Sequence, residues 1–166
     1  MTLVLLIGGA RSGKSRLALE RAEREGAPVV FVATGEALDA EMTERIERHR
    51  AERPGGWTTI EEPVELERAL AEVPGGATAI VDCLSLWVAN VFESRAVEAL
   101  SAAAVRAAAA RLGLTIAVTN EVGLGIVPDN ALARAYRDAL GRVNAQWAEA
   151  ADEACLVVAG RTLELA

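Results

Sequence analysis

The eight residues from Gly8 to Ser15 constrain the fold of this chain more than any other segment. They read GGARSGKS, which fits the pattern G-x-x-x-x-G-K-[ST], and they lie between an apolar run, LVLLI, and a helical run, KSRLALERAERE. In this context the glycines let backbone N–H groups surround phosphate oxygens, and the N-terminus of the following helix adds positive potential. Lys14 is the only lysine in the chain, and a lysine at this position reaches the β- and γ-phosphates of a nucleotide. We therefore predict a phosphate-binding loop, or P-loop, with Lys14 as a catalytic cation and Ser15 as a magnesium ligand. The nucleotide contacts predicted from this loop are Gly8, Gly9, Ala10, Arg11, Ser12, Gly13, Lys14 and Ser15.

Short apolar runs alternate with longer helical stretches along the whole chain. The runs that we predict to be strands are residues 3–7, 29–33, 58–61, 77–82, 114–119 and 155–159. The stretches that we predict to be helices are residues 14–25, 40–52, 64–71, 84–93, 96–111 and 130–150. This alternation is typical of α/β proteins with a mostly parallel sheet. Together with the P-loop, it predicts one domain over residues 1–166, a P-loop NTPase-like three-layer α/β/α domain with a twisted sheet (RecA-like).

Composition excludes several classes of function. The chain has 24 acidic and 17 basic residues and a net charge of -7, which would repel nucleic acids and anionic lipid surfaces. The apolar stretch at the N-terminus is short and ends in a glycine turn, so we interpret it as a strand and expect no stable membrane insertion. Cys83 and Cys155 both lie in apolar runs, and we interpret them as reduced core residues of a cytoplasmic protein. A disulfide between them is the alternative.

His49, the only histidine, lies in the predicted helix 40–52. Met42, Ile46 and His49 follow the i, i+4, i+7 spacing, so the imidazole should face the protein. Nearby arginines of the same segment are Arg45, Arg50 and Arg53. Guanidinium groups around an imidazole oppose its protonation and attract a triphosphate, so His49 could act as a neutral nucleophile on phosphorus. A structural histidine satisfied within the helix is the alternative interpretation.

Asp82 ends the apolar run ATAIVD. A P-loop enzyme usually has a carboxylate at the end of a neighbouring strand, where it orders the magnesium ion and its waters. We therefore predict that Asp82 and Ser15 hold Mg²⁺. The alternative role for Asp82 is to cap the helix that begins near Leu84.

Three segments together resemble a known family. They are GGARSGKSR, AEMTERIERHRAERPGGW and TNEVGLGIVPDNALARAYRDALGRVNAQWAEAADEACLVVAG. They resemble the bifunctional adenosylcobinamide kinase / adenosylcobinamide-phosphate guanylyltransferase family of cobalamin biosynthesis, and the likeness spans nearly the whole chain. The combination of R-I-x-x-H-R-x-x-R-P with T-N-E-V-G-x-G-I-V-P is more specific than the P-loop alone.

The resemblance implies two reactions at one nucleotide site. Adenosylcobinamide takes the γ-phosphate of ATP or GTP, and adenosylcobinamide phosphate then receives GMP from GTP through a covalent histidine intermediate, which here would be His49. The resemblance also implies a homotrimer. Beyond the P-loop, it implies nucleotide contacts at Ala33, Thr34, Gly35, Arg50, Ala51, Glu52, Arg53, Glu61 and Asp82.

The segment from residue 119 to 128 follows a predicted strand, at the edge where ligands bind in such folds. We hypothesise that it shapes the corrinoid side of the site, while a glycine turn without a ligand is the alternative. Asp129 is expected to cap the next helix. The stripe that this helix should bury, in the core or against another subunit, is Leu132, Tyr136, Ala139, Leu140, Val143 and Trp147. We interpret the tryptophans, Trp57, Trp87 and Trp147, as packing residues.

Two other functions remain open from the sequence. A single-step P-loop kinase for a small molecule would use the same loop but would not need His49. A nucleotide-gated regulatory module would bind GTP without transferring any group. Neither explains the segments around His49 and residues 119–128.

Overall fold

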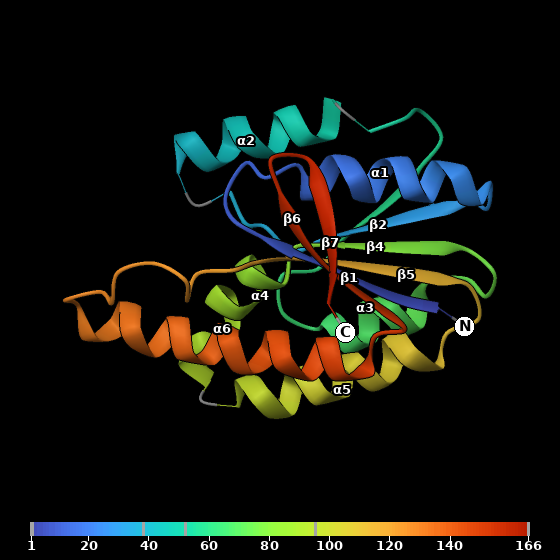
Figure 1. Cartoon of the computed structure of the whole chain (residues 1–166). Coiled ribbons are helices and arrows are strands. Elements are labelled where there is room, and N and C mark those ends of the chain that lie inside the picture. The colour runs from blue at the N-terminus through green and yellow to red at the C-terminus, as the bar shows by residue number, and fades with distance from the viewer. Residues whose placement is uncertain (1, 38, 52, 95, 166) are drawn as a thin grey trace.

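The computed structural model describes residues 2–37, 39–51, 53–94 and 96–165, except for the side chains at positions 41 and 45. These residues form one seven-stranded sheet in the order β3-β2-β4-β5-β1-β6-β7, flanked by helices (Figure 1). All neighbouring strands are parallel except β6 and β7, which pair antiparallel. The predicted mostly parallel α/β sheet is confirmed.

The strands and helices follow the predicted alternation. The strands are β1 (Thr2–Gly8), β2 (Val29–Ala33), β3 (Thr58–Glu61), β4 (Thr78–Asp82), β5 (Leu114–Asn120), β6 (Glu153–Val158) and β7 (Arg161–Leu165). The helices are α1 (Lys14–Glu25), α2 (Ala40–Ala51), α3 (Leu66–Glu72), α4 (Leu84–Val91), the 3-10 helix η1 (Phe92–Ser94), α5 (Val97–Ala110) and α6 (Ala131–Ala150). Strand β7 was not predicted, and the predicted strand 155–159 begins earlier and ends at Val158.

Helices cover both faces of the sheet, which gives the three layers expected. α1 and α2 lie on one face, and α3, α4, α5 and α6 lie on the other (Figure 1). β1 shows how the sequence produces this arrangement, because successive side chains of a strand point to opposite faces. Leu3 and Leu5 join the core under α3–α6, whereas Val4 and Leu6 pack with Ala18 of α1. A strand buried on both faces needs a continuous apolar run, as LVLLI provides.

The turn between β6 and β7 contacts the P-loop through a backbone hydrogen bond. Ala159 and Gly160 both have positive φ, 51° and 75°, as a two-residue hairpin turn of this kind requires. The Gly160 N–H donates a hydrogen bond of 2.7 Å to the carbonyl of Ser12. The β6–β7 hairpin, of which β7 was not predicted, therefore contacts the P-loop directly.

Four smaller predictions have outcomes in the structure. The N-cap of α6 is Asn130 rather than Asp129, because the Asn130 side chain accepts hydrogen bonds from the N–H groups of Leu132 and Ala133. Cys83 and Cys155 are both buried and unbridged, so the disulfide is excluded. The tryptophans pack as expected: Trp87 and Trp147 are buried in the core and Trp57 lies partly buried against it. Leu132, in contrast to the rest of its stripe, is exposed.

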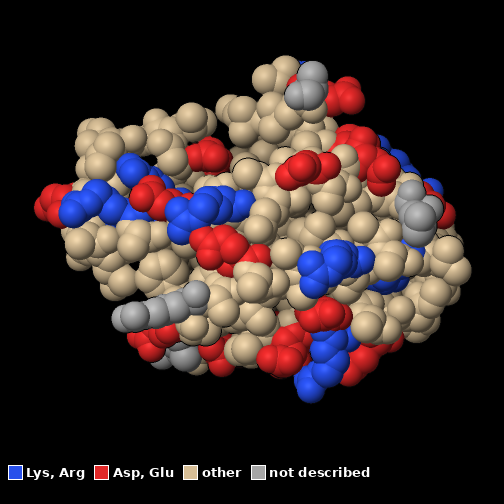
Figure 2. All heavy atoms as spheres, turned by 90° about the horizontal axis from the view of Figure 1, so that it is seen from below, with Lys and Arg blue, Asp and Glu red and all other residues tan. Residues whose placement is uncertain are grey.

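Within the described residues, no helix is both long enough and apolar enough to cross a bilayer. The face that α5 and α6 form carries acidic and basic side chains interspersed with uncharged surface (Figure 2). One ion pair on it, Glu98 with Arg142, joins the two helices at 2.5 Å. Charges of both signs are therefore mixed on this face.

An ion pair between α1 and β6 should make stability depend on pH. Arg21 donates two hydrogen bonds to Glu153, at 2.6 and 2.7 Å, and this contact holds the pKa of Glu153 below its ordinary value against the opposing effect of burial. A carboxyl with a lowered folded pKa stabilises the protein above its unfolded pKa, and this contribution disappears as the pH falls through the folded value. We expect Glu153→Gln to lower the free energy of unfolding by about 1 kcal/mol at pH 7 and to cost progressively less below about pH 4.

Urea denaturation of both proteins between pH 7 and pH 3 measures this difference. Glu20→Gln is the matched control, because its partners Arg16 and Arg24 have side chains that are 59% and 78% exposed and such surface pairs contribute little. A deficit in Glu153→Gln that stays constant over the whole pH range would contradict this role of the ion pair.

Candidate active site

The carboxyl ends of five parallel strands bring the predicted site residues to one edge of the sheet. Ala33 at the end of β2 lies in register with Glu61 of β3 on one side and with Asp82 of β4 on the other. Gly8 at the end of β1 lies in register with Asn120 of β5. Ligands of open α/β folds bind at this edge.

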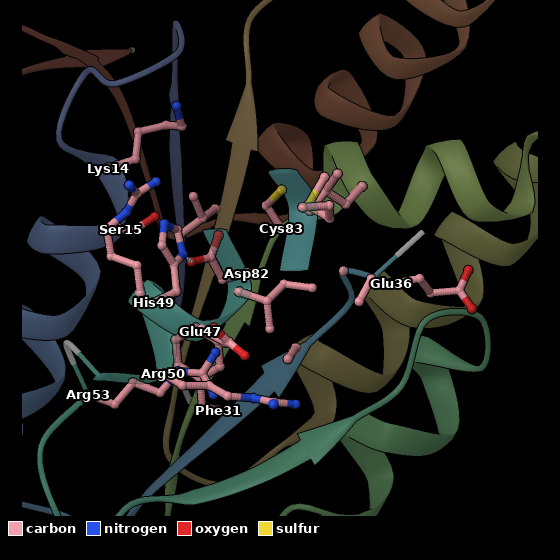
Figure 3. A pocket seen from close by; sticks show the side chains of 18 of the residues that line it. Lys14, Ser15, Phe31, Glu36, Glu47, His49, Arg50, Arg53, Asp82 and Cys83 are labelled. Carbon is pink, nitrogen blue, oxygen red and sulfur yellow. Dashed lines mark ion pairs between the residues drawn. The ribbon is translucent and has the colours of Figure 1, made fainter. Parts of the chain in front are cut away.

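The P-loop has the backbone geometry that its glycines predict. Gly13 has φ of 100°, in the left-handed region that favours glycine, and α1 begins at the next residue. Lys14 is buried, and its Nζ donates to the carbonyls of Gly8 at 2.9 Å and Gly9 at 2.7 Å. In Figure 3 the Lys14 side chain extends away from His49 and back along its own loop.

Gly8 and Gly9 differ in the space around them, which allows a test of the loop's packing. A Cβ added at Gly8 would clash with the backbone carbonyl of Val157 in β6, whereas one added at Gly9 would meet nothing within 4 Å. A clash with backbone forces the sheet or the loop to move, so we expect Gly8→Ala to lower the free energy of unfolding by about 2 kcal/mol. Gly9→Ala is the control and should unfold close to the wild type. Equal urea midpoints for the two variants would contradict the close contact between the loop and β6.

A large cavity of about 1080 Å³ opens beside the P-loop. Its lining comes from the P-loop, α2 and the ends of β2, β3, β4 and β5 (Figure 3). The predicted site residues that line it are Ala10, Arg11, Ser12, Gly13, Lys14, Ser15, Ala33, Gly35, His49, Arg50, Arg53, Glu61 and Asp82. Gly8, Gly9, Thr34 and Ala51 are not among the lining residues. Glu52 lies outside the described part of the chain.

His49 and Asp82 meet in this cavity. His49 Nδ1 lies 3.8 Å from Asp82 Oδ2, and their side chains are 31% and 10% exposed. Figure 3 shows the imidazole of α2 and the carboxylate of β4 facing one another. Asp82 does not cap α4, whose N-cap is Cys83 without a side-chain hydrogen bond, so the capping role considered for Asp82 is wrong. A carboxylate on one side of an imidazole can orient the ring and select its tautomer.

The arginines near His49 have other partners than the sequence suggested. Arg50 forms an ion pair with Glu61. Arg53 lies over the Phe31 ring, with 3.7 Å from its Cζ to the ring centroid, and donates to Thr59 Oγ1 at 3.1 Å. Burial lowers the pKa of Arg53, and the Asp82 carboxylate opposes that shift. The side chain of Arg45 lies outside the described residues. Among the described side chains, the ion-pair partner of His49 is therefore the carboxylate of Asp82.

The donor set in the cavity fits a magnesium ion. Ser15 supplies a hydroxyl and Asp82 a carboxylate, and both line the same cavity. In the described residues there is no group of three or more His, Cys, Asp or Glu side chains able to hold a metal. Magnesium is commonly held by one or two protein oxygens together with waters and substrate phosphates rather than by a protein cage, so Ser15 and Asp82 are the candidate protein ligands.

Comparison with known proteins identifies the family. Residues 4–165 match the family described as cobinamide kinase / cobinamide phosphate guanyltransferase. The chain belongs to this family. The cobinamide kinase / cobinamide phosphate guanyltransferase family is a transferase family, and the match covers every element that builds the cavity.

Curated relatives agree with this assignment. The chain is 40% identical over 165 residues to the bifunctional adenosylcobalamin biosynthesis protein CobP of Pseudomonas aeruginosa, covering 97% of this chain and 95% of that protein. It is 38% identical over 175 residues to the bifunctional adenosylcobalamin biosynthesis protein CobU of Escherichia coli, covering 95% of this chain and 96% of that protein. The protein of the same name from Salmonella typhimurium is 39% identical over 175 residues, with the same coverage.

Several lining residues of this family member were not identified from the sequence. Phe31, Glu36, Leu86 and Cys83 all line the cavity. Phe31 lies in the apolar run of β2, where a residue that faces a ligand looks the same as one that faces the core. The only available signal was its position two residues before Ala33, which places both side chains on one face of the strand.

The segment 119–128 is divided between the cavity and the surface. Asn120 lines the cavity, and Asn144 of α6 donates to its carbonyl at 3.0 Å. Beyond it the chain is exposed, with Leu124 84% and Ile126 99% accessible. Where the segment ends, Asn130 and Leu132 line a second hollow of about 950 Å³ beside α4 and α5.

Proposed function

We propose that this chain is a bifunctional enzyme that phosphorylates adenosylcobinamide and then transfers GMP to the product. The observation that carries the proposal is that one cavity holds both a P-loop and a histidine–carboxylate pair. A P-loop suits attack at the γ-phosphorus of a nucleotide. A histidine in the same cavity suits covalent attack at a phosphorus atom.

In the first reaction, the hydroxyl of the aminopropanol group of adenosylcobinamide attacks the γ-phosphorus of ATP or GTP. The new O–P bond forms as the bond from the γ-phosphorus to the β-bridging oxygen breaks, the hydroxyl proton passes to solvent, and the nucleoside diphosphate leaves. Lys14 and the N–H groups of the P-loop stabilise charge on the transferring group. The products are adenosylcobinamide phosphate and ADP or GDP.

In the second reaction, His49 attacks the α-phosphorus of GTP. Because Nδ1 faces Asp82, we assign the attack to Nε2 of the Nδ1-protonated ring. An N–P bond forms and pyrophosphate leaves, giving a guanylyl-histidine. A phosphate oxygen of adenosylcobinamide phosphate then attacks the same phosphorus, the N–P bond breaks, and adenosylcobinamide-GDP is released with His49 restored.

Ser15 and Asp82 would hold a magnesium ion in both reactions. When bound, this ion supplies charge neutralisation for the transferring and leaving phosphates. The remaining work falls to the protein: Lys14 binds the phosphates, and Asp82 orients His49.

The corrinoid side of the site is proposed at the segment 119–128. It begins in the nucleotide cavity at Asn120 and ends beside the second hollow, and its exposed apolar side chains suit a large macrocycle. We expect Ile126→Ser to raise the KM for adenosylcobinamide about tenfold without changing the KM for ATP. Leu112→Ser is the control, because Leu112 is exposed but lies two residues before β5, at the opposite end of that strand. An unchanged KM in Ile126→Ser would place the corrinoid elsewhere.

Assembly and location are part of the same proposal. A homotrimer follows from the resemblance, and exposed apolar side chains in the segment 119–128 and in β7 are consistent with contacts between copies. Sedimentation equilibrium tests the trimer, and a monomer at micromolar concentration would contradict it. A cytoplasmic location remains a prediction from composition and cysteine usage.

The test of the proposed function is product analysis. Purified protein is incubated with adenosylcobinamide and magnesium in two separate reactions, one with ATP and one with GTP. The corrinoid products are separated and identified by mass spectrometry. We expect the phosphate from ATP, and the phosphate followed by adenosylcobinamide-GDP with release of pyrophosphate from GTP. Formation of the phosphate alone under both conditions would instead support a single-step kinase.

A further inference from the structure

Thr34 connects two strand ends of the active site from inside the protein. It directly follows β2 and is fully buried. Its Oγ1 donates to the carbonyl of Cys83 at 2.8 Å and accepts from the Cys83 N–H at 2.9 Å. Both hydrogen bonds fall on the residue next to Asp82.

The backbone of Thr34 adds to this connection. Its N–H donates to the carbonyl of Asp82 at 3.3 Å. Its carbonyl accepts from Nδ2 of Asn90 in α4 at 2.8 Å, and the same amide donates to the Pro63 carbonyl at 3.1 Å. Asn90 therefore ties together the chain that leaves β2 and the chain that leaves β3.

These bonds converge on the carboxylate that faces His49. Asp82 is the last residue of β4, and no ladder pairing continues beyond it to hold its backbone. Beyond the end of β4, the Thr34 side chain provides the hydrogen bonds to the Cys83 backbone that a neighbouring strand would otherwise provide. Small displacements matter at such a place, since a shift of about 1 Å in a catalytic group can cost on the order of 100-fold in rate.

We propose that Thr34 is a positioning residue, which holds the backbone at Asp82 and Cys83 so that the Asp82 carboxylate faces His49, with Asn90 holding Thr34 in turn. This assigns the Thr34 side chain to the support of the site and not to direct contact with the nucleotide. The inference rests on the proposed function, in which Asp82 orients the nucleophile.

Each variant changes a single side chain of this connection or of its control. Thr34→Val keeps the shape of the side chain but removes the hydroxyl that bonds to the Cys83 N–H and carbonyl, and Thr34→Ser restores that hydroxyl. Thr78→Val is the matched control, because Thr78 is a buried threonine in β4 whose hydroxyl has no hydrogen-bond partner within the described structure. Asn90→Ala is a second variant that loosens the same connection if Thr34→Val does not fold.

The first readout is independent of activity. Because His49 is the only histidine, untagged protein labelled with ¹⁵N at histidine gives one set of imidazole signals. We expect Thr34→Val, and to a lesser degree Asn90→Ala, to shift these signals in the direction that Asp82→Asn shifts them, whereas Thr34→Ser and Thr78→Val leave them in place. Imidazole signals in Thr34→Val that coincide with those of the wild type would overturn the proposal.

The second readout is the rate of each reaction. We expect Thr34→Val to lower kcat for guanylyl transfer by about 10- to 100-fold with KM for GTP changed by less than about 3-fold, and Thr34→Ser to recover most of the loss. A loss in Thr34→Val no larger than in Thr78→Val, with the wild type active, would also overturn the proposal. A wild type that forms neither corrinoid product would refute the proposed function instead, while the imidazole signals would still report whether Thr34 positions Asp82.

Discussion

His49→Ala should abolish guanylyl transfer and leave the kinase reaction close to that of the wild type. The imidazole is the nucleophile of the second reaction in our proposal, and removing a catalytic nucleophile typically lowers kcat by about 10⁴- to 10⁶-fold. The kinase reaction uses the P-loop, and we expect its rate to change by less than about 5-fold. Parallel assays of adenosylcobinamide phosphate and adenosylcobinamide-GDP formation measure both rates on one protein sample.

The kinase rate is the internal control for this variant. His49 is 31% exposed on α2 and makes its recorded contact with Asp82 at 3.8 Å, so its loss should not unfold the domain. Equal losses of both activities would mean that His49 shapes the cavity in general. Full retention of guanylyl transfer would exclude the covalent route and leave direct attack on GTP as the mechanism.

Lys14→Met should abolish the kinase reaction. Methionine keeps the length and apolar stem of the side chain but removes the cation that neutralises the transferring phosphoryl group. Electrostatic groups of this kind are typically worth about 10³-fold in kcat. A coupled assay of ADP formation that depends on adenosylcobinamide measures the effect.

A folding control is needed because Lys14 also donates to the carbonyls of Gly8 and Gly9. Arg24→Met is the matched variant, since Arg24 is a cation near the end of the same helix with a side chain that is 78% exposed. We expect Arg24→Met to retain full activity and Lys14→Met to keep a cooperative thermal unfolding transition. A folded Lys14→Met that keeps its kinase rate within about 10-fold of the wild type would contradict the role of the P-loop lysine.

The sequence was sufficient where local chemistry decides structure. The P-loop pattern between a strand and a helix predicted α1 with the bounds that the structure has. Asp82 was expected at the carboxyl end of a strand, and β4 ends at Asp82, in register with the end of β2 at Ala33. In parallel sheets these positions converge whatever the details of packing.

The sequence was insufficient where two distant segments decide the outcome together. The approach of His49 to Asp82 depends on where α2 lies over the sheet, which no local pattern specifies. The same is true of Arg53 over Phe31 and of the Thr34 hydrogen bonds to Cys83. Arginines adjacent in sequence to His49 were therefore assigned to it, although Arg50 and Arg53 lie against β3 and β2 residues.

Two errors have a more local origin. Strand β7 has exposed side chains throughout, so it lacks the apolar run by which the other strands were recognised. Asp129 and Asn130 are adjacent and both are good capping residues, and only the path of the loop decides between them. Here Arg134 of α6 donates to the carbonyls of Pro128 and Asp129. These bonds hold the loop that precedes α6, and Asn130 is then the N-cap residue.

The most direct test of the central claim is to trap the covalent intermediate. Wild type and His49→Ala are incubated with magnesium and GTP labelled at the α-phosphate, and the protein is then separated from free nucleotide under denaturing conditions. We expect label on the wild type, stable in base and lost in acid as a phosphoramidate is, and none on His49→Ala. An unlabelled wild type, or label that survives the replacement of His49, would contradict the guanylyl-histidine and with it the two-reaction account of this cavity.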